Sequence, residues 1–184
     1  MLVIFVLSED VIHAPRRAAE LGWDAQARGA LGEAEALFGA AVEMDAADHE
    51  LHYGLASTLS MQGRPREARA SLLAGLQQYG LSPKLHVALG SLLLKAGRPR
   101  AALRRFERTL ALSPDPSDAE AREAAVYAGL CGVRLAQSNP SLAAQLLPPA
   151  ERRLKGALRE GPGDKASGIE GLLREAAVLR ERLL

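Results

Sequence analysis

Cysteine, aromatic residues and strand-forming residues are scarce in this chain of 184 residues. The single cysteine, Cys131, excludes a framework of intrachain disulfides. It lies among Ala, Gly and Leu residues, which favours a small buried side chain. Aromatic residues make up 4% of the chain, whereas Ala, Leu and Arg are abundant. Because the abundant residues favour helix and the scarce ones favour strand, the composition predicts an all-α protein with a sizeable core.

The chain also lacks a long apolar run. Its N-terminus has seven consecutive apolar residues, Met1–Leu7, whereas a membrane span needs about 20. A secretory signal would need a basic flank and small residues at a cleavage site, and neither is present. We expect residues 1–14 to pack on the first helix pair and cover its open end. The alternative is that they are the remainder of a longer apolar segment. The expected protein is soluble and cytoplasmic.

No catalytic constellation is found in the sequence. It has no glycine-rich phosphate loop, no nucleophile elbow and no His-Glu-x-x-His pattern. His49 and His52 are three residues apart, but no cysteine pair lies nearby to complete a metal site. We therefore expect no enzyme activity, no metal and no cofactor.

A block of about 34 residues repeats through the first two-thirds of the chain. Gly63-Arg64-Pro65-Arg66 recurs as Gly97-Arg98-Pro99-Arg100, and the same offset relates leucines and alanines on both sides of it. A fixed period of this length is typical of a solenoid built from stacked helix pairs. Each glycine suits a helix end, and each proline suits the first turn of the next helix.

The period divides the chain into repeats. Three helix pairs are expected in residues 15–116, a divergent fourth pair with an insertion at 138–149 in residues 117–164, and a capping helix in residues 165–184. The expected helices cover residues 15–28, 33–45, 49–61, 66–78, 83–95, 100–112, 119–137 and 166–184. The last helix has a polar outer face, as the end of a solenoid requires.

The third repeat carries the most specific pattern: Leu89-Gly90, then Gly97, and then a second helix with Ala102, Phe106 and Thr109 before Pro114. With this pattern the chain resembles the tetratricopeptide-repeat family over residues 15–116. The resemblance implies a right-handed superhelix whose first helices line a concave groove that receives a peptide or helix. The lysine and asparagine set that binds a C-terminal carboxylate in some members is matched only by Lys84.

The resemblance assigns these groove positions by register: Trp23, Gln26, Glu50, Tyr53, Ser57, Met61, Lys84, Val87, Ser91, Leu94 and Lys95. Aromatic residues often anchor interfaces, which favours a binding role for Trp23 and Tyr53. The alternative is that these two rings complete the packing between neighbouring helix pairs.

Charge is unevenly distributed although the net charge is +1. Residues 1–63 have three basic and ten acidic side chains, and residues 64–116 have ten basic and three acidic ones. The resemblance places several arginines on second helices, which form the outer face: Arg66, Arg69, Arg100, Arg104, Arg105 and Arg108. No aromatic residues lie among them to stack on bases, so nucleic acid is not the expected partner. A membrane is not expected either, because the apolar run is short.

The preferred interpretation is therefore a non-enzymatic adaptor that binds a peptide or helix of another protein in its groove. A self-assembling scaffold, joined through its acidic end and basic middle, is the first alternative. An arginine-mediated binder of nucleic acid or anionic surfaces is the second. Salt distinguishes them, because charge-driven binding weakens with salt and groove binding should not.

Overall fold

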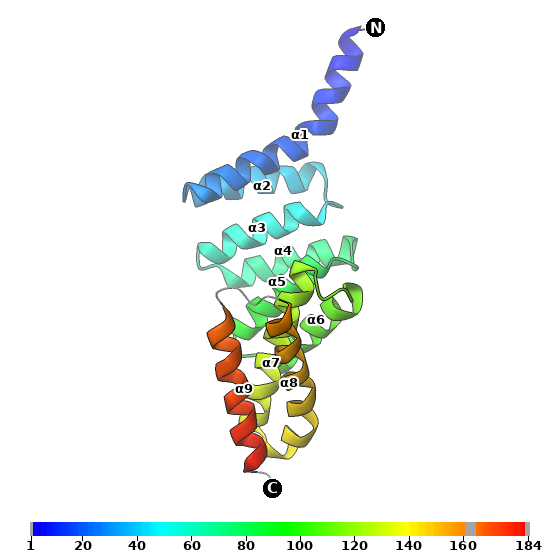
Figure 1. The fold of residues 1–184 in the computed structure, drawn as a ribbon. Coiled ribbons are helices and arrows are strands. Elements are labelled where there is room, and N and C mark those ends of the chain that lie inside the picture. The colour runs from blue at the N-terminus through cyan, green and yellow to red at the C-terminus, as the bar shows by residue number, and fades with distance from the viewer. Residues whose placement is uncertain (1, 161–164, 183–184) are drawn as a thin grey trace. The chain divides into compact units, whose positions relative to one another are not determined.

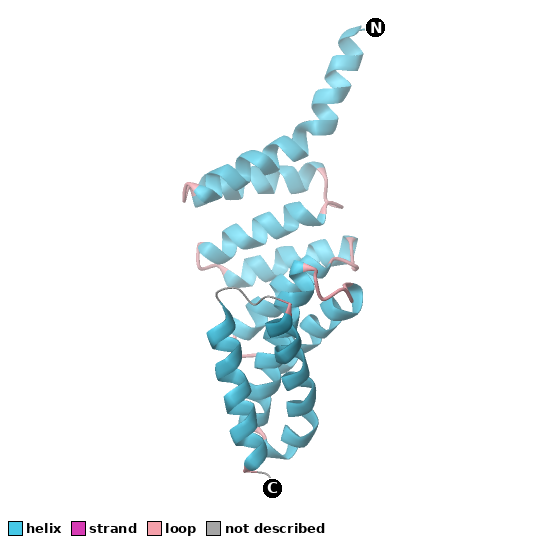
Figure 2. Ribbon diagram, viewed as in Figure 1, coloured by secondary structure: helices cyan, strands magenta, loops and turns pink. Residues whose placement is uncertain are grey.

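The structure is a computed structural model that describes residues 2–160 and 165–182, with side chains from residue 14 onward. Within these ranges the chain is helical and contains no strand (Figure 2). It divides into two compact units, residues 1–85 and 86–184. The helices run in order as α1 (Leu2–Ala27), α2 (Leu31–Met44), α3 (His49–Met61), α4 (Pro65–Gln78), α5 (Pro83–Lys95), α6 (Pro99–Leu112), α7 (Ala119–Ser138), η1 (Pro140–Leu142), α8 (Ala143–Arg159) and α9 (Ala166–Glu181). Successive helices pack on one another within each unit (Figure 1), which confirms the predicted all-α solenoid class.

Three glycines at 34-residue spacing make the turns inside the helix pairs. Gly29, Gly63 and Gly97 have φ values of 77°, 76° and 70°, which a residue with a Cβ rarely adopts. The residue after each glycine donates its N–H to a carbonyl five positions back, for example Arg64 to Leu59 at 2.9 Å. This is the Schellman pattern that ends a helix. The predicted role of these glycines is confirmed, and Pro65 and Pro99 begin the following helices as expected.

Phe38 is the centre of the core between α1, α2 and α3. Its ring is fully buried, and it lies against backbone positions that have no side chain, Gly22 and Gly54. A Cβ on Gly54 would lie 2.3 Å from Cε1 of Phe38. Trp23 packs on the same ring edge-on, at 4.8 Å between centroids. The small residues of α1 and α3 therefore let one large ring join two helix pairs.

Arg64 joins the first two helix pairs at their turn end. Its guanidinium pairs with Glu35 of α2 at 2.7 Å and with Glu67 of α4 at 2.5 Å. Gln62 donates to the carbonyl oxygen of Leu31 at 3.0 Å in the same cluster. The hydrogen bonds from Arg64 lower the pKa of Glu35 and of Glu67, so both carboxylates are charged at neutral pH.

Helix α7 is the central element of the second unit. It packs against α6, α8 and α9 and buries residues on several faces. Two glycines allow the close approach of α8, because a Cβ on Gly129 would lie 2.6 Å from Leu154 and one on Gly132 would lie 2.8 Å from Ala150. Cys131 lies fully buried on this helix, as expected. Burial raises the pKa of its thiol to about 11, which leaves it protonated and unreactive at neutral pH.

The expected insertion at 138–149 is largely helical. The 3-10 turn η1 is followed by α8 from Ala143, and both Pro148 and Pro149 lie inside this helix. Proline inside a helix usually breaks it, so a continuous helix here needs a compensating contribution to stability. The cost of the two prolines is offset by a continuous buried stripe on α8 that packs against α7 and α9, formed by Ala143, Leu147, Ala150, Leu154 and Ala157.

The N-terminal segment continues the first helix instead of forming a separate element, since α1 runs from Leu2 with Pro15 inside it. Its predicted packing on the first helix pair concerns side chains outside the described residues. The predicted turn at 161–164 also lies outside them.

Candidate partner-binding face

Residues predicted for the groove lie together on α1, α3 and the first turn of α5 in the first unit. The rings of Trp23 and Tyr53 are 5.9 Å apart between centroids, so α1 and α3 share an aromatic pair. One turn further along, the Gln26 amide donates to Ser57 at 3.3 Å and to Thr58 at 2.9 Å. Side chains of the neighbouring first helices α1 and α3 thus form one row. We call these residues, together with Glu50, Met61 and Lys84, the α1/α3 face.

Lys84 extends the α1/α3 face to α5. Its Nζ lies 2.7 Å from a carboxylate oxygen of Glu50 and 5.0 Å from the centroid of the Tyr53 ring. Glu50 and Lys84 are 34 residues apart, so they occupy the same position in successive repeats with opposite charge. The pair is part-exposed, and it holds the ammonium group over the aromatic ring, which favours a fixed orientation for both.

The two aromatic rings pack between helices and also remain partly exposed to solvent. Trp23 and Tyr53 are both half-buried, and Trp23 rests on the buried ring of Phe38. The alternative role of these rings, packing between neighbouring helix pairs, is therefore present in the structure. Part of each ring nevertheless remains exposed and available to a partner. Met61, at the end of α3, is 56% exposed and adds free apolar surface to the face.

The groove positions expected on the rest of α5 belong to the second unit. Ser91 and Leu94 are half-buried and Lys95 is exposed. Val87 is only 6% exposed, so its side chain mainly fills the core of that unit. The structure brings these four residues onto one helix.

The arginines predicted for an outer surface lie on second helices. Arg66 and Arg69 are exposed on α4. Arg100, Arg104 and Arg108 are exposed on α6, and Arg105 is half-buried there. No carboxylate of the described residues lies within 4.0 Å of any of these six guanidinium groups.

Two contributors were missed by the sequence analysis. Thr58 is buried, and its hydroxyl oxygen accepts a hydrogen bond from the Gln26 amide. The same hydroxyl donates a hydrogen bond to the carbonyl oxygen of Gly54 at 2.9 Å. The Phe38 ring packs against the Trp23 ring. A signal for both was available, because Phe38 is itself a position of the repeat pattern, two periods before Phe106, and Thr58 adjoins the groove position Ser57.

Metal ligands and membrane spans were searched for among the described residues. No group of three or more His, Cys, Asp or Glu side chains there could hold a metal ion. His52 is instead fixed by the Ala46 carbonyl oxygen, 3.0 Å from its Nε2. No described helix is both long and apolar enough to cross a membrane.

The helical-repeat fold and this face are typical of a protein-interaction module. A family profile described as the tetratricopeptide repeat matches residues 25–92, and a second profile of the same description matches residues 87–165. Together the two matches cover most of the chain, and it therefore belongs to the tetratricopeptide-repeat family. Repeats of this family are typically non-catalytic protein-interaction modules. A comparison with curated protein sequences finds no match.

Solved structures of tetratricopeptide proteins share the fold. PilF of Pseudomonas aeruginosa has a TM-score of 0.72 at 17% identity, over 94% of this chain and 76% of that one. YrrB, a TPR protein with an unusual peptide-binding site, has a TM-score of 0.61 at 19% identity, over 89% and 85%. SycD of Yersinia enterocolitica, in complex with a peptide of the translocator YopD, has a TM-score of 0.58 at 17% identity, over 65% and 92%.

Proposed function

We propose that this chain is a non-enzymatic adaptor that binds a segment of a partner protein along the α1/α3 face. The observation that carries the proposal is the row of part-exposed side chains that Trp23, Tyr53 and Lys84 form across three successive first helices. A peptide lying across this row would contact several repeats at once. Two of the solved relatives are associated with peptide binding, which supports the same use of the fold here.

The chemistry of the face favours an amphipathic helix or an apolar peptide. Tyr53 and the exposed Met61 offer a rigid aromatic surface and an adaptable thioether. Ser57, Gln26 and the Glu50–Lys84 pair offer polar contacts around them. An apolar side chain of the ligand would cover the ring and thioether, and its polar side would meet the hydroxyl, amide and charged groups. The proposal includes a cytoplasmic location, which cell fractionation tests.

A matched pair of double variants tests the proposed face. Tyr53→Ala/Met61→Glu alters the face, and Tyr79→Ala/Met44→Glu alters the same residue types elsewhere in the unit. Met61 and Met44 are equally exposed, at 56%, and Tyr79 is 47% exposed beside His49. We expect the face variant to retain at least about tenfold less partner in pull-downs from the source cell, while the control variant retains as much as the native chain.

The pull-down is made at low and at moderate salt, after circular dichroism has shown equal helicity. Retention that survives moderate salt fits binding through the aromatic and thioether groups of the face rather than through its charged pair. If the face variant keeps its partners, and all chains lose them when salt is raised, the proposal fails and the arginines of α4 and α6 become the site to pursue.

A further inference from the structure

Arg64 and Arg98 occupy the same position in successive repeats, directly after the glycines that turn each helix pair. Their backbones have nearly the same conformation, with φ −107° and ψ 62° at Arg64 and φ −113° and ψ 61° at Arg98. The N–H of each donates to the carbonyl oxygen five residues back, at 2.9 Å in both turns. The two side chains therefore start from the same backbone geometry.

Arg64 has two carboxylate partners within the chain. Its Nε and Nη2 donate to the two carboxylate oxygens of Glu67 at 2.7 Å and 2.5 Å, and its Nη1 donates to Glu35 at 2.7 Å. Nη1 also donates to the amide oxygen of Gln62 at 2.7 Å. A guanidinium group presents its N–H groups in a fixed fork that matches carboxylate oxygens. An arginine at this position of the repeat can thus bind two carboxylates at once.

Arg98 has none of these partners. At the three positions 34 residues after the partners of Arg64, the chain has Arg69, Ala96 and Ala101. The Arg98 side chain is exposed, and no carboxylate of the described residues lies within 4.0 Å of its guanidinium group. The third repeat therefore keeps the arginine and its backbone geometry, but the described part of the chain supplies no carboxylate to it.

Arg98 lies among other basic residues. Lys95 ends α5 and Arg100 lies in the first turn of α6, and both side chains are exposed. Neither has a carboxylate within 4.0 Å among the residues that the structure describes. None of residues 68–106 is Asp or Glu. The turn between α5 and α6 and the residues on both sides of it therefore carry positive charge only.

The acidic residues within α6 and α8 are already paired. Glu107, the one acidic residue of α6, pairs with Arg153 at 2.9 Å. Glu151, the one acidic residue of α8, pairs with Arg180 at 3.2 Å and with Lys155 at 3.7 Å. These carboxylates therefore neutralise other cations and leave Arg98 available.

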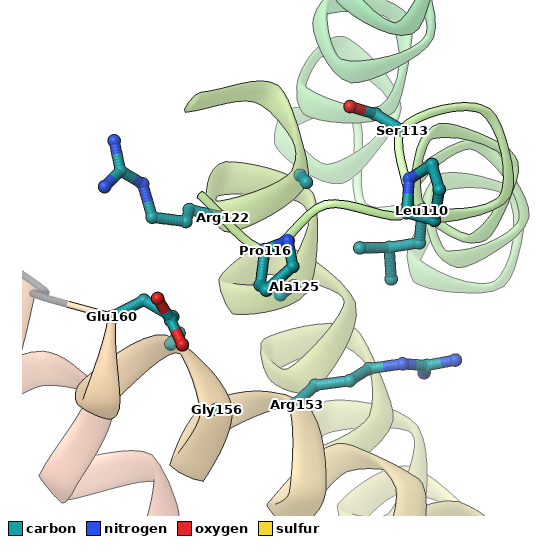
Figure 3. Close-up of a pocket in the computed structure, with 11 residues that line it drawn as sticks. Leu110, Ser113, Pro116, Arg122, Ala125, Arg153, Gly156 and Glu160 are labelled. Carbon is teal, nitrogen blue, oxygen red and sulfur yellow. The ribbon is translucent and has the colours of Figure 1, made fainter. Parts of the chain in front are cut away.

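The remaining acidic residues beside α6 lie at its other end. They are in the loop after α6, at the start of α7 and directly after α8: Asp115, Asp118, Glu120, Glu123 and Glu160. Figure 3 shows this end, with Glu160 beside the pocket that Leu110 of α6 lines. At about 1.5 Å per helical residue, Asp115 lies roughly 20 Å from Arg100 along α6. Charges more than about 8 Å apart are largely screened at physiological salt, so these carboxylates do not offset the basic turn.

We propose that the turn between α5 and α6 binds an acidic segment of a partner protein, with Arg98 holding its carboxylates as Arg64 holds those of the chain. Lys95 and Arg100 contact further acidic side chains of the same segment. Nucleic acid fits less well, because residues 95–105 include no aromatic side chain that could stack on bases. The site is in the second unit and outside the α1/α3 face, so its failure would leave the proposed peptide binding untouched.

A carboxylate added within the chain should occupy Arg98 and block the site. Ala101→Glu places one three residues after Arg98, as Glu67 follows Arg64. Ala101→Gln has nearly the same shape without the charge and is the matched control. Ala111→Glu is a second control, because this exposed position of α6 changes the net charge equally, about 15 Å further along the helix. Arg98→Gln removes the guanidinium group itself.

Fluorescence anisotropy with a labelled peptide of alternating glutamate and serine tests the proposal, at about 0.15 M salt. A peptide with glutamine in place of glutamate measures binding without charge. We expect the native chain, Ala101→Gln and Ala111→Glu to bind the glutamate peptide equally. Ala101→Glu and Arg98→Gln should bind it at least about fivefold more weakly, since each removes charge-assisted hydrogen bonds to the ligand. The native chain should bind the glutamine peptide at least about tenfold more weakly than the glutamate peptide.

Four results would overturn the proposal. Equal binding of the two peptides would exclude recognition of carboxylates. A loss in either control variant as large as that in Ala101→Glu would assign the effect to shape or to net charge instead of to Arg98. A single-stranded oligonucleotide that displaces the labelled peptide more effectively than unlabelled peptide does would assign the turn to phosphates. Self-association of the native chain in sedimentation velocity that Ala101→Glu abolishes would make a second copy the occupant.

Discussion

Replacing Phe38 with alanine is expected to lower the free energy of unfolding by about 3–5 kcal/mol, the usual cost of removing a fully buried aromatic side chain. The ring contacts Gly22 on α1, Gly54 on α3 and the Trp23 ring. The two glycines have no side chain that could move into the space. The cavity would therefore remain open, and the cost should lie in the upper part of this range.

Denaturant unfolding followed by tryptophan fluorescence measures this effect. Trp23 is the only tryptophan of the chain and lies 4.8 Å from the Phe38 ring, so its signal reports on the same contact. Met44→Ala on the same helix is the control, and its exposed side chain should change stability by no more than about 0.5 kcal/mol. If Phe38→Ala lowers the free energy of unfolding by less than about 1 kcal/mol, the three helices do not share this core.

Replacing Gly54 with alanine is expected to destabilise the chain, although alanine is the better helix former. Removing a helical glycine gains about 0.5–1 kcal/mol. The new methyl group would lie 2.3 Å from Cε1 of Phe38, and relieving such a contact typically costs about 1–3 kcal/mol. Because the ring is buried on all sides, the steric cost should exceed the gain in helix propensity. The free energy of unfolding should therefore fall by about 1–2 kcal/mol.

Gly39→Ala is the control that measures the gain in helix propensity alone. Gly39 lies in α2, and a Cβ added there would meet no atom within 4 Å, so only the gain of about 0.5–1 kcal/mol is expected. In the Phe38→Ala background, Gly54→Ala should become neutral or stabilising, since the obstacle is gone. Equal effects of Gly54→Ala in both backgrounds would contradict the contact.

The sequence predicts the first three helix pairs well because one local rule repeats. Glycine at a left-handed turn and proline at the next helix start recur at the same spacing, and Gly63 with Pro65 shows both. Helix α3 has the expected bounds, and its neighbours differ from expectation by one or two residues. These features depend on residues near one another in the chain, which is why a sequence pattern captures them.

Tertiary packing decides the features that the sequence does not reveal. The sequence pattern predicts an insertion at 138–149, but the buried stripe that includes Leu147 and Leu154 keeps α8 helical through Pro148 and Pro149. The pattern places Trp23 in the groove, yet only the structure shows that it also rests on Phe38. Lys84 was expected at the surface, and its position over Tyr53 depends on its ion pair with Glu50.

Site-specific photo-crosslinking tests the central claim, that the α1/α3 face binds a partner protein, most directly. A photoreactive residue placed at Met61 should form an adduct with a partner in the source cell, because this exposed position adjoins the aromatic row. The same residue placed at Arg69, exposed on α4, should not capture that partner. Capture from position 69 and none from position 61 would contradict the account and assign binding to the second helices.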